Sequence, residues 1–295
     1  MSSQPNIYWL ASYPKSGNTW TRAFITSLRE ESADGIDINA LETSAIASGR
    51  AWIESALEFD IGELSHDEVD YLRPSAYRWL SRQLDSPGYH KIHDAYTLLP
   101  NGEALIPSDA TKGALCIIRN PLDVAISLAH HNACTVDEAI SYMAKPDYAF
   151  CANPKRLHYQ LRQWLLTWSD HVLSWADAPG INKMIVRYED MKHNSVETFS
   201  EIATFLELPN DRRSITDALD RCKIEKLQAQ EAKTNFNERS EKAESFFRKG
   251  VVGDWQNTLA DKQIQKIIQD HRCVMQRFGY LDAQGMPSEQ ISFQG

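Results

Sequence analysis

The stretch Ile7–Trp20 (IYWLASYPKSGNTW) constrains the fold of this 295-residue chain more than any other. It opens as an apolar run that favours a β-strand, breaks at Tyr13-Pro14, and continues with apolar residues at helical spacing. A strand that passes through a Gly-containing loop into a helix is the layout of a phosphate-binding loop, because backbone N–H groups of the loop and the helix start point at one place. The sequence therefore predicts an α/β fold that binds a phosphate-like group at this loop.

Lys15 adds a full positive charge to the loop, and neighbouring side chains can add hydrogen bonds. These are Ser16, Asn18 and Thr19. The loop is not a Walker A sequence, since GxxxxGK[ST] places its Lys after the second Gly and here Lys15 precedes Gly17. A P-loop nucleotide kinase or NTPase stays open as an alternative, and so does a non-catalytic nucleotide-binding protein of the same fold.

Composition narrows the classes of function. The formal net charge of -9 at pH 7 argues against a general nucleic-acid or membrane-surface binder. An anionic ligand must then be held by a local basic cluster. The five Cys are odd in number, scattered and without a CxxC pair, which indicates reduced thiols, a cytoplasmic protein and no zinc site. No apolar run approaches membrane-spanning length.

The segment YPKSGNTW resembles the 5′-phosphosulfate-binding loop of the sulfotransferases that use PAPS (3′-phosphoadenosine 5′-phosphosulfate), whose cytosolic members read YPKSGTTW. Three further segments match this family in the family's order. They are KIHDA at 91–95, RNPLDVAIS at 119–127 and RKGVVGDW at 248–255. The resemblance implies a single P-loop-NTPase-like domain with a central parallel β-sheet flanked by helices, PAPS as co-substrate and no metal ion.

Transfer of a sulfuryl group to a hydroxyl needs a base within hydrogen-bond reach, and imidazole has a suitable pKa near neutrality. Cytosolic family members carry KTHLP, and many bacterial ones KTHD, where this chain reads Lys91-Ile92-His93-Asp94. The resemblance therefore implies that His93 is the base. Lys91 is expected to assist at the leaving group or to bind acceptor. Asp94 orients the imidazole or caps a turn, and we favour the turn.

The resemblance also implies two anion sites that suit the two phosphate-bearing ends of PAPS. The 5′-phosphosulfate is expected to be bound by Lys15, Ser16, Gly17, Asn18 and Thr19. The 3′-phosphate is expected to be bound by Arg119, Ser127, Arg248, Lys249 and Gly250. An Arg can grip a phosphate through two N–H groups, and a Gly lets the backbone approach closely.

The adenine is expected to lie next to Trp20 and to Tyr188 of the YEDM segment. Glu189 and Asp190 of that segment are expected to be structural. Cys222 and Ile224 stand where the family has a small hydroxyl residue and a Phe near the adenine, so contacts from these positions stay open. The family's dimer motif KxxxTVxxxE is missing after Trp255, and the oligomeric state also stays open.

We expect a sulfotransferase domain at 1–281 and a flexible tail at 282–295. The acidic segment 32–88 is predicted to be a helical insertion, which either packs on the core or caps the acceptor site. The aromatic residues of 32–88 and 134–153 favour a hydrophobic or aromatic small-molecule acceptor, or serve packing. The polar run Gln228–Lys242 is expected to order when nucleotide binds.

The remaining patterns predict regular elements. Strands are expected at Ile7–Ser12, Ala114–Ile118 and Lys183–Arg187, and His90–Ala95 is expected to contain a strand and its exit. Helices are expected at Asn18–Glu30, Ala51–Leu57, Ser65–Leu72, Pro74–Leu84, Val136–Ala144, Pro154–Trp175, Ser195–Leu206, Ser214–Leu227 and Asp261–Phe278. A capping box is expected at Ser65.

Overall fold

A computed structural model describes residues 5–30, 35–41, 43, 46–240 and 243–288. The chain forms two compact units, each assembled from three separate segments. The first unit comprises Met1–Tyr13, Thr43–Cys116 and Lys145–Ile185; the second comprises Pro14–Glu42, Ile117–Ala144 and Val186–Gly295. Over the described ranges, no helix combines the length and the apolar character needed to cross a bilayer.

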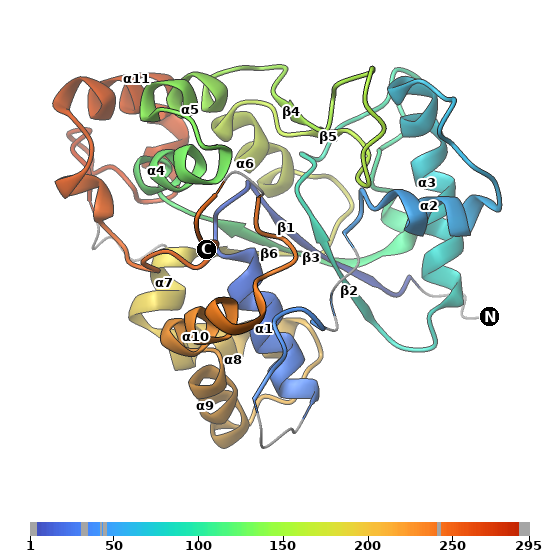
Figure 1. The fold of residues 1–295 in the computed structure, drawn as a ribbon, viewed down its shortest axis with the longest axis horizontal. Helices are drawn as coiled ribbons and strands as arrows, with labels where there is room; N and C mark the ends of the chain where they lie inside the picture. Colours follow the sequence, from blue (N-terminus) through green and yellow to red (C-terminus); the bar gives the residue numbers. More distant parts are fainter. Residues whose placement is uncertain (1–4, 31–34, 42, 44–45, 241–242, 289–295) are drawn as a thin grey trace. The chain divides into compact units, whose positions relative to one another are not determined.

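A four-stranded sheet lies mainly in the first unit (Figure 1). Its order is β2 (Gly88–Ile92), β1 (Ile7–Ser12), β3 (Thr111–Ile118) and β6 (Lys183–Arg187). All six residues of β1 are buried, as an apolar strand with a neighbour on each side requires. β1 runs parallel to β2, with Ile7 opposite Gly88. The predicted strands and the α/β fold with a central parallel sheet are confirmed.

The segment predicted as a helical insertion contributes α2 (Arg50–Leu57) and α3 (His66–Gln83) to the first unit. α3 starts with the predicted capping box, in which the Glu68 backbone N–H donates to Ser65 Oγ over 3.3 Å. Apolar side chains of both helices share one core cluster with Trp9 of β1 and Ile92 of β2. Residues 32–34, 42, 44 and 45 of this segment lie outside the described part.

The prediction of two helices broken at Pro74 is wrong, because α3 runs through this proline. A proline inside a helix removes one hydrogen bond and costs about 3 kcal/mol. Here the flanking side chains of Arg73 and Tyr77 are fully buried. Their packing and hydrogen bonds hold the helical turn around Pro74 and outweigh the local cost.

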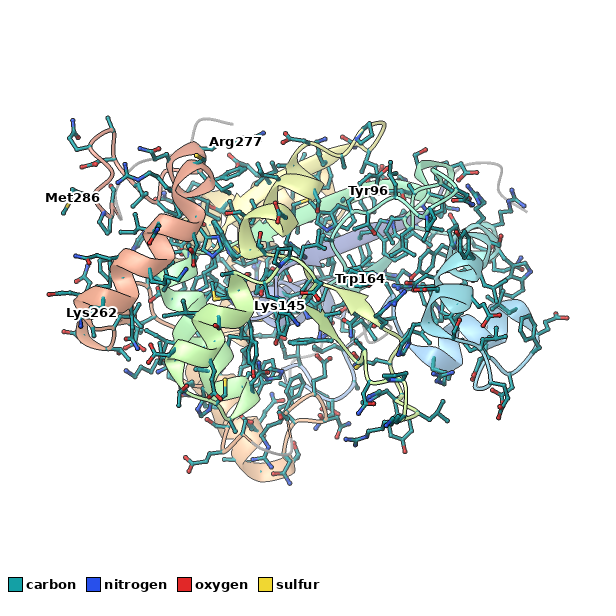
Figure 2. The ribbon with its side chains drawn as sticks, turned by 90° about the horizontal axis from the view of Figure 1, so that it is seen from above. Tyr96, Lys145, Trp164, Lys262, Arg277 and Met286 are labelled. Atoms are coloured by element: carbon teal, nitrogen blue, oxygen red, sulfur yellow. The ribbon has the colours of Figure 1, made fainter. Side chains whose placement is uncertain are left out.

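The predicted helix Pro154–Trp175 is also wrong in its first half. Only α6 (Trp168–Ala176) forms, and Thr167 caps its start by accepting the Asp170 backbone N–H over 2.9 Å. The residues before it include β5 (Gln163–Trp164), which pairs antiparallel with β4 (Ala149–Phe150). Figure 2 labels Trp164 on this short ribbon.

Backbone hydrogen bonds to distant segments explain why the apolar spacing at 157–165 does not produce a helix. The Leu161 N–H donates to the Ser48 carbonyl over 2.6 Å, and the Trp164 carbonyl accepts the Ala95 N–H over 2.7 Å. Leu157, which would belong to the buried helix face, is 68% exposed. Bonds between segments have replaced the local helical ladder.

The second unit is mainly helical. Its α-helices are α1 (Asn18–Arg29), α4 (Pro121–Asn132), α5 (Val136–Met143), α7 (Tyr188–His193), α8 (Ser195–Phe205), α9 (Arg212–Arg221), α10 (Ile224–Thr234) and α11 (Asp261–Arg277). α4 packs against α5 and α11, and Lys262 and Arg277 mark the two ends of α11 in Figure 2. Short 3-10 turns lie at Ser108–Ala110 in the first unit and Asp254–Asn257 in the second.

The predicted single helix Ser214–Leu227 is instead the end of α9 and the start of α10. Lys223 between them is extended (φ -57°, ψ 141°). The Asp220 carboxylate pairs with both Lys223 and Lys226 at 2.6 Å, which stabilises the turn from one helix into the next.

Two further predictions concern segments near the end of the chain. The start of the polar run Gln228–Lys242 is helical, within α10, and residues 241–242 lie outside the described part. In the predicted tail, the Asp282 N–H donates to the Met286 carbonyl over 2.9 Å, which closes a turn. Residues 289–295 of the tail are not among those described.

Candidate active site

The loop that follows β1 belongs to the second unit from Pro14 onward. Two of its residues have left-handed backbones, Lys15 with φ 72° and Gly17 with φ 108°. Such a conformation is rare for a residue with a side chain, and it concentrates at functional sites. Gly17 is the N-cap of α1 and has no side chain to occupy the free N–H groups of the first turn. The loop and this helix end therefore form a backbone concavity suited to an anion.

Gly17 is required for space as well as for its backbone angle. A Cβ at this position would lie 2.7 Å from Cδ2 of Tyr188, the first residue of α7. No side chain fits there unless Tyr188 moves. The glycine of the loop and the predicted adenine-side tyrosine are therefore packed directly on each other.

A buried hydroxyl group in the loop, that of Ser16, is evidence that the loop binds an anion. Ser16 Oγ is fully buried, and among the described residues it has no hydrogen-bond partner. The same holds for the Nε atom of Arg119. An unsatisfied buried donor costs about 1–3 kcal/mol, so such donors in native proteins call for an explanation. Phosphate or sulfate oxygens would accept from both.

Arg119 joins three parts of the second unit. It follows β3 directly and precedes α4, whose N-cap Asn120 accepts the Leu122 N–H over 3.1 Å. Its Nη1 donates to the Lys15 carbonyl over 3.1 Å, and its Nη2 donates to the Val251 carbonyl over 3.0 Å. The guanidinium also lies 4.4 Å from the centre of the Tyr188 ring. The loop, Tyr188 and the segment 248–253 are thus brought together around one cation.

Lys15 points its ammonium group at an aromatic ring. Its Nζ lies 3.9 Å from the ring centre of Phe246, a cation–π contact. Phe246 packs in turn against Phe236 and Phe247, with ring centres 4.7 and 5.1 Å away. This contact places the residues just before the RKG run beside the phosphate-type loop.

Arg248 and Lys249 share one counter-ion. The Asp254 carboxylate lies 2.8 Å from Arg248 Nη2 and 2.6 Å from Lys249 Nζ. The turn that carries Asp254 is fastened by Asp123 of α4, which accepts the N–H groups of Gly253 and Trp255 over 2.9 and 3.1 Å. Burial raises the pKa of Asp123, and the nearby Arg119 charge opposes that shift.

Gly250 packs on Ile224, a residue whose contact with the adenine the sequence left open. Its backbone is left-handed (φ 60°), and a Cβ would lie 3.2 Å from Ile224 Cγ1. Ile224 therefore contacts the RKG run. Cys222 is buried, and burial raises the pKa of its thiol to about 12. Ser127 lies half-buried on α4.

Trp20 stands in the first turn of α1 with one edge against aromatic neighbours. Its ring centre is 4.9 Å from that of Phe199 and 6.1 Å from that of Tyr188, both at steep angles. Lys192 Nζ lies 5.2 Å from the Trp20 ring centre. Trp20 and Tyr188 are therefore neighbours, as a shared adenine-binding role requires.

Glu189 and Asp190 are held in structural hydrogen bonds, as predicted. Glu189 accepts the Asn120 backbone N–H over 2.9 Å and the Tyr280 hydroxyl over 3.1 Å. Asp190 accepts two N–H groups of Arg187, over 2.6 and 2.8 Å. These bonds fasten α7, on which Tyr188 stands.

His93 and Lys91 belong to the first unit. His93 directly follows β2 and is buried, and its Nδ1 lies 2.8 Å from the Ser12 carbonyl oxygen. A carbonyl only accepts, so Nδ1 carries a hydrogen, and a neutral ring in this orientation would have its lone pair on Nε2. Lys91 is half-buried on β2, and its carbonyl accepts the Ala47 N–H over 2.8 Å. The imidazole therefore has the tautomer that a base acting through Nε2 needs.

Two residues near His93 were missed from the sequence. His171 Nε2 lies 3.1 Å from the His93 carbonyl oxygen, and burial lowers the His171 pKa to about 4, so this ring is a neutral donor. Arg73 binds the carboxylate of Asp94. Asp94 is thus the partner of a buried arginine. The one available signal was the place of Arg73 on a helix face with Val69, Ala76 and Tyr77, which are all buried.

Among the described residues, no three His, Cys, Asp or Glu side chains are grouped to hold a metal ion.

The family model for the sulfotransferase domain matches residues 5–279. Cytosolic sulfotransferase 1 of Arabidopsis thaliana is 28% identical over 273 residues, which are 88% of this chain and 75% of that protein. Flavonol 3-sulfotransferase of Flaveria bidentis is 28% identical over 283 residues, 90% of this chain and 80% of that protein.

Two solved structures share the fold. Mouse sulfotransferase SULT7A1, complexed with PAP, superposes with a TM-score of 0.60 at 19% identity and covers 94% of this chain and 85% of that chain. Retinol dehydratase, in complex with androsterone and the inactive cofactor PAP, gives a TM-score of 0.58 at 18% identity over 94% of this chain and 82% of that chain.

Proposed function

Because the chain belongs to the sulfotransferase family, we propose that it moves the sulfuryl group of PAPS to a hydroxyl or amine of a small-molecule acceptor, in the cytoplasm and without a metal ion. The observation that carries the proposal is the loop after β1, with its left-handed Lys15 and Gly17 and the buried, unpartnered Ser16 hydroxyl. PAP, the nucleotide left after sulfuryl transfer, is bound in the mouse structure of the same fold.

The residues present fit the two charged ends of PAPS. Lys15, Ser16 and the N–H groups of 17–19 would hold the 5′-phosphosulfate. The 3′-phosphate would lie with Arg119, Ser127, Arg248, Lys249 and Gly250. Trp20 and Tyr188 would contact the adenine. A phosphate at Arg248 and Lys249 would compete with Asp254 for both cations, since their side chains are 26% and 53% exposed.

When bound, PAPS supplies an activated sulfuryl group whose bond to the 5′-phosphate oxygen breaks as the bond to the acceptor oxygen forms. His93 Nε2 would take the acceptor proton, while the Nδ1–H bond to the Ser12 carbonyl stabilises the imidazolium that results. Lys15 and the loop amides would stabilise the charge that grows on the leaving phosphate. Lys91 would assist from β2. These cationic groups supply the charge that a metal ion provides in many phosphoryl transfers.

The insertion 32–88 and the segment 134–153 would shape the acceptor site. Aromatic side chains on the second segment support an aromatic or hydrophobic acceptor. Tyr148 and Phe150 form an edge-to-face pair with ring centres 5.7 Å apart, next to the ribbon of β4 and β5. Such rings offer flat apolar contact to a planar acceptor.

Thermal unfolding with candidate nucleotides tests the proposal. We expect 3′,5′-ADP to raise Tm more than ADP or ATP, equally with and without Mg²⁺. A nucleotide at about a hundred times its Kd stabilises the folded state by about 2.7 kcal/mol, a readily measured shift. An acceptor panel with PAPS would follow. Preference for ATP with Mg²⁺ would instead point to a nucleotide kinase.

A further inference from the structure

We propose that Arg73 is a positioning residue for His93: its buried pair with Asp94 fixes the chain on which the imidazole stands and ties that chain to helix α3. This inference rests on the proposed function, because it assumes that His93 acts as the base. All the residues concerned belong to the first unit.

The pair between Arg73 and Asp94 is bidentate and fully buried. Arg73 Nη1 donates to Asp94 Oδ1 over 3.0 Å, and Nη2 donates to Oδ2 over 2.8 Å. Both side chains are 0% exposed. Two parallel N–H bonds fix the direction of a carboxylate as well as its distance. Asp94 follows His93 directly in the chain, so its side chain cannot turn without moving the backbone next to the imidazole.

Nε and Nη1 of Arg73 make further hydrogen bonds. Nε donates to the Tyr77 hydroxyl over 2.9 Å, and Nη1 is shared with Asp70 at 3.3 Å and with the Arg162 carbonyl at 3.0 Å. The guanidinium is thus held by groups on α3 itself and on the strand-like segment before β5. It is a fixed point against which Asp94 is held, and not a flexible side chain that follows it.

The backbone around His93 is fixed by further contacts of the same unit. The His93 carbonyl receives the His171 Nε2–H, and the Asp94 carbonyl receives the Trp175 Nε1–H over 2.9 Å. The Ala95 N–H donates to the Trp164 carbonyl, whose own N–H lies 3.3 Å from Asp94 Oδ1. Two peptide groups in a row, 93–94 and 94–95, are therefore restrained, and the Ser12 carbonyl accepts from Nδ1 of the imidazole.

Stability alone does not account for a pair of this kind. Removing two charges from water costs several kcal/mol per ion, and apolar residues of similar volume often replace a buried ion pair with equal or greater stability. What an apolar pair cannot supply is direction. α3 belongs to the insertion for which packing on the core and capping of the acceptor site are the two predicted roles. In the second role, the pair would transmit the position of that helix to the base.

The test separates positioning from packing by comparing single and double variants. Arg73→Met leaves Asp94 buried without its partner, so Tm should fall strongly. The double variant Arg73→Met/Asp94→Leu removes both charges, and its Tm should recover most of that loss. Its kcat should still stay about 10- to 100-fold below the original, the usual effect of misplacing a reacting group by about 1 Å. Affinity for 3′,5′-ADP should be unchanged.

Arg78→Met is the matched control. Arg78 lies on the same helix and also binds two carboxylates, Glu103 at 2.6 Å and Asp109 at 2.9 Å, but it is half-exposed and has no bond to residues 93–95. Its kcat should be unchanged. Arg73→Lys is the second test variant, because it keeps the positive charge but loses the two parallel N–H bonds to the Asp94 carboxylate. It should lower kcat with a smaller loss of Tm.

Full kcat in the double variant or in Arg73→Lys would overturn the proposal and make the pair merely structural. NMR of the His93 ring protons adds a readout that needs no turnover. The double variant should show faster exchange of the Nδ1 proton with solvent, and an unchanged exchange rate would also count against positioning. If the unmodified protein transfers no sulfuryl group from PAPS to any acceptor, the proposed function fails, while this NMR measurement still decides whether Arg73 fixes the ring.

Discussion

The carboxylates of Asp94 and Asp254 are both buried and both held by cations, but the cations that hold them differ in exposure. Asp94 in the first unit pairs with Arg73, and neither side chain is exposed. Asp254 in the second unit pairs with Arg248 and Lys249, whose side chains are 26% and 53% exposed. No water reaches the Arg73–Asp94 pair, so neither side chain can exchange its partner for water or for a dissolved ion. In the second group the cations Arg248 and Lys249 are partly solvated and can reach another anion, although the Asp254 carboxylate between them is only 7% exposed.

The difference separates two uses of charge. A cation whose task is to bind a ligand keeps its side chain partly in water and has a counter-ion that the ligand can replace. A cation whose task is to fix geometry is buried and makes several hydrogen bonds to protein groups. By this criterion Arg248 and Lys249 suit a nucleotide phosphate, and Arg73 suits a permanent role beside His93.

The largest expected effect comes from replacing His93, the proposed base next to the buried Arg73–Asp94 pair. His93→Ala should lower turnover by about 100- to 10,000-fold, since that is the usual contribution of a general base. Binding of 3′,5′-ADP should be retained, because the predicted nucleotide ligands belong to the second unit. Turnover is measured with PAPS and an accepted substrate, and nucleotide binding by calorimetry. If nucleotide binding is lost together with turnover, His93 is structural.

A smaller effect is expected on the exposed side. Arg248→Gln/Lys249→Gln should weaken 3′,5′-ADP binding by about 10- to 100-fold or more, since a hydrogen bond to a charged group contributes about 1.5–3 kcal/mol. Without nucleotide, the free energy of unfolding should fall by less than in Arg73→Met, because Arg248 and Lys249 are partly solvated whereas Arg73 is fully buried. Calorimetry and urea unfolding give the two numbers. Arg213→Gln is the control, because Arg213 is 91% exposed and pairs with Asp217 on the same helix. A large loss of stability in the double variant would remove the contrast with Arg73.

The smallest expected effect uses pH. Burial lowers the pKa of His171 from 6.5 to about 4, so the unfolded chain takes up a proton first as pH falls. His171 is therefore neutral in both the folded and the unfolded chain above about pH 6.5 and does not reduce stability there. As pH decreases towards 4, its preferential protonation in the unfolded chain lowers the free energy of unfolding by about 3 kcal/mol in total. In His171→Asn the stability should fall less steeply over this range, as measured by urea unfolding at several pH values. His193→Asn, at an exposed position, should leave the slope unchanged. An equal slope in His171→Asn would show that His171 is not the buried neutral group.

What the sequence predicted well was local. The strand at Ile7–Ser12, the loop and the helix from Asn18 form one continuous stretch, and the chemistry of a phosphate loop is contained within it. The predictions that failed depended on distant partners. The residues before Trp168 bond to Ser48 and Ala95 instead of forming a helix, and buried neighbours carry α3 through Pro74.

The contacts around His93 were out of reach for the same reason. Arg73 is 21 positions from Asp94, and His171 is 78 positions from His93. No periodic pattern or short motif links such residues. A motif identifies the group that would react, while the residues that hold it come from wherever the fold brings polar side chains into the core.

The assembly of each unit from three separated segments has a consequence for synthesis. The first unit needs Lys145–Ile185 for its last segment, and the second needs residues from Val186 onward. Because a chain leaves the ribosome from its N-terminus at about 5–20 residues per second, β1 waits several seconds for β3 and β6. During that time its apolar residues are without their final neighbours. The nascent chain should therefore depend on chaperones until well past its midpoint, and no single cut would release either unit as a continuous fragment.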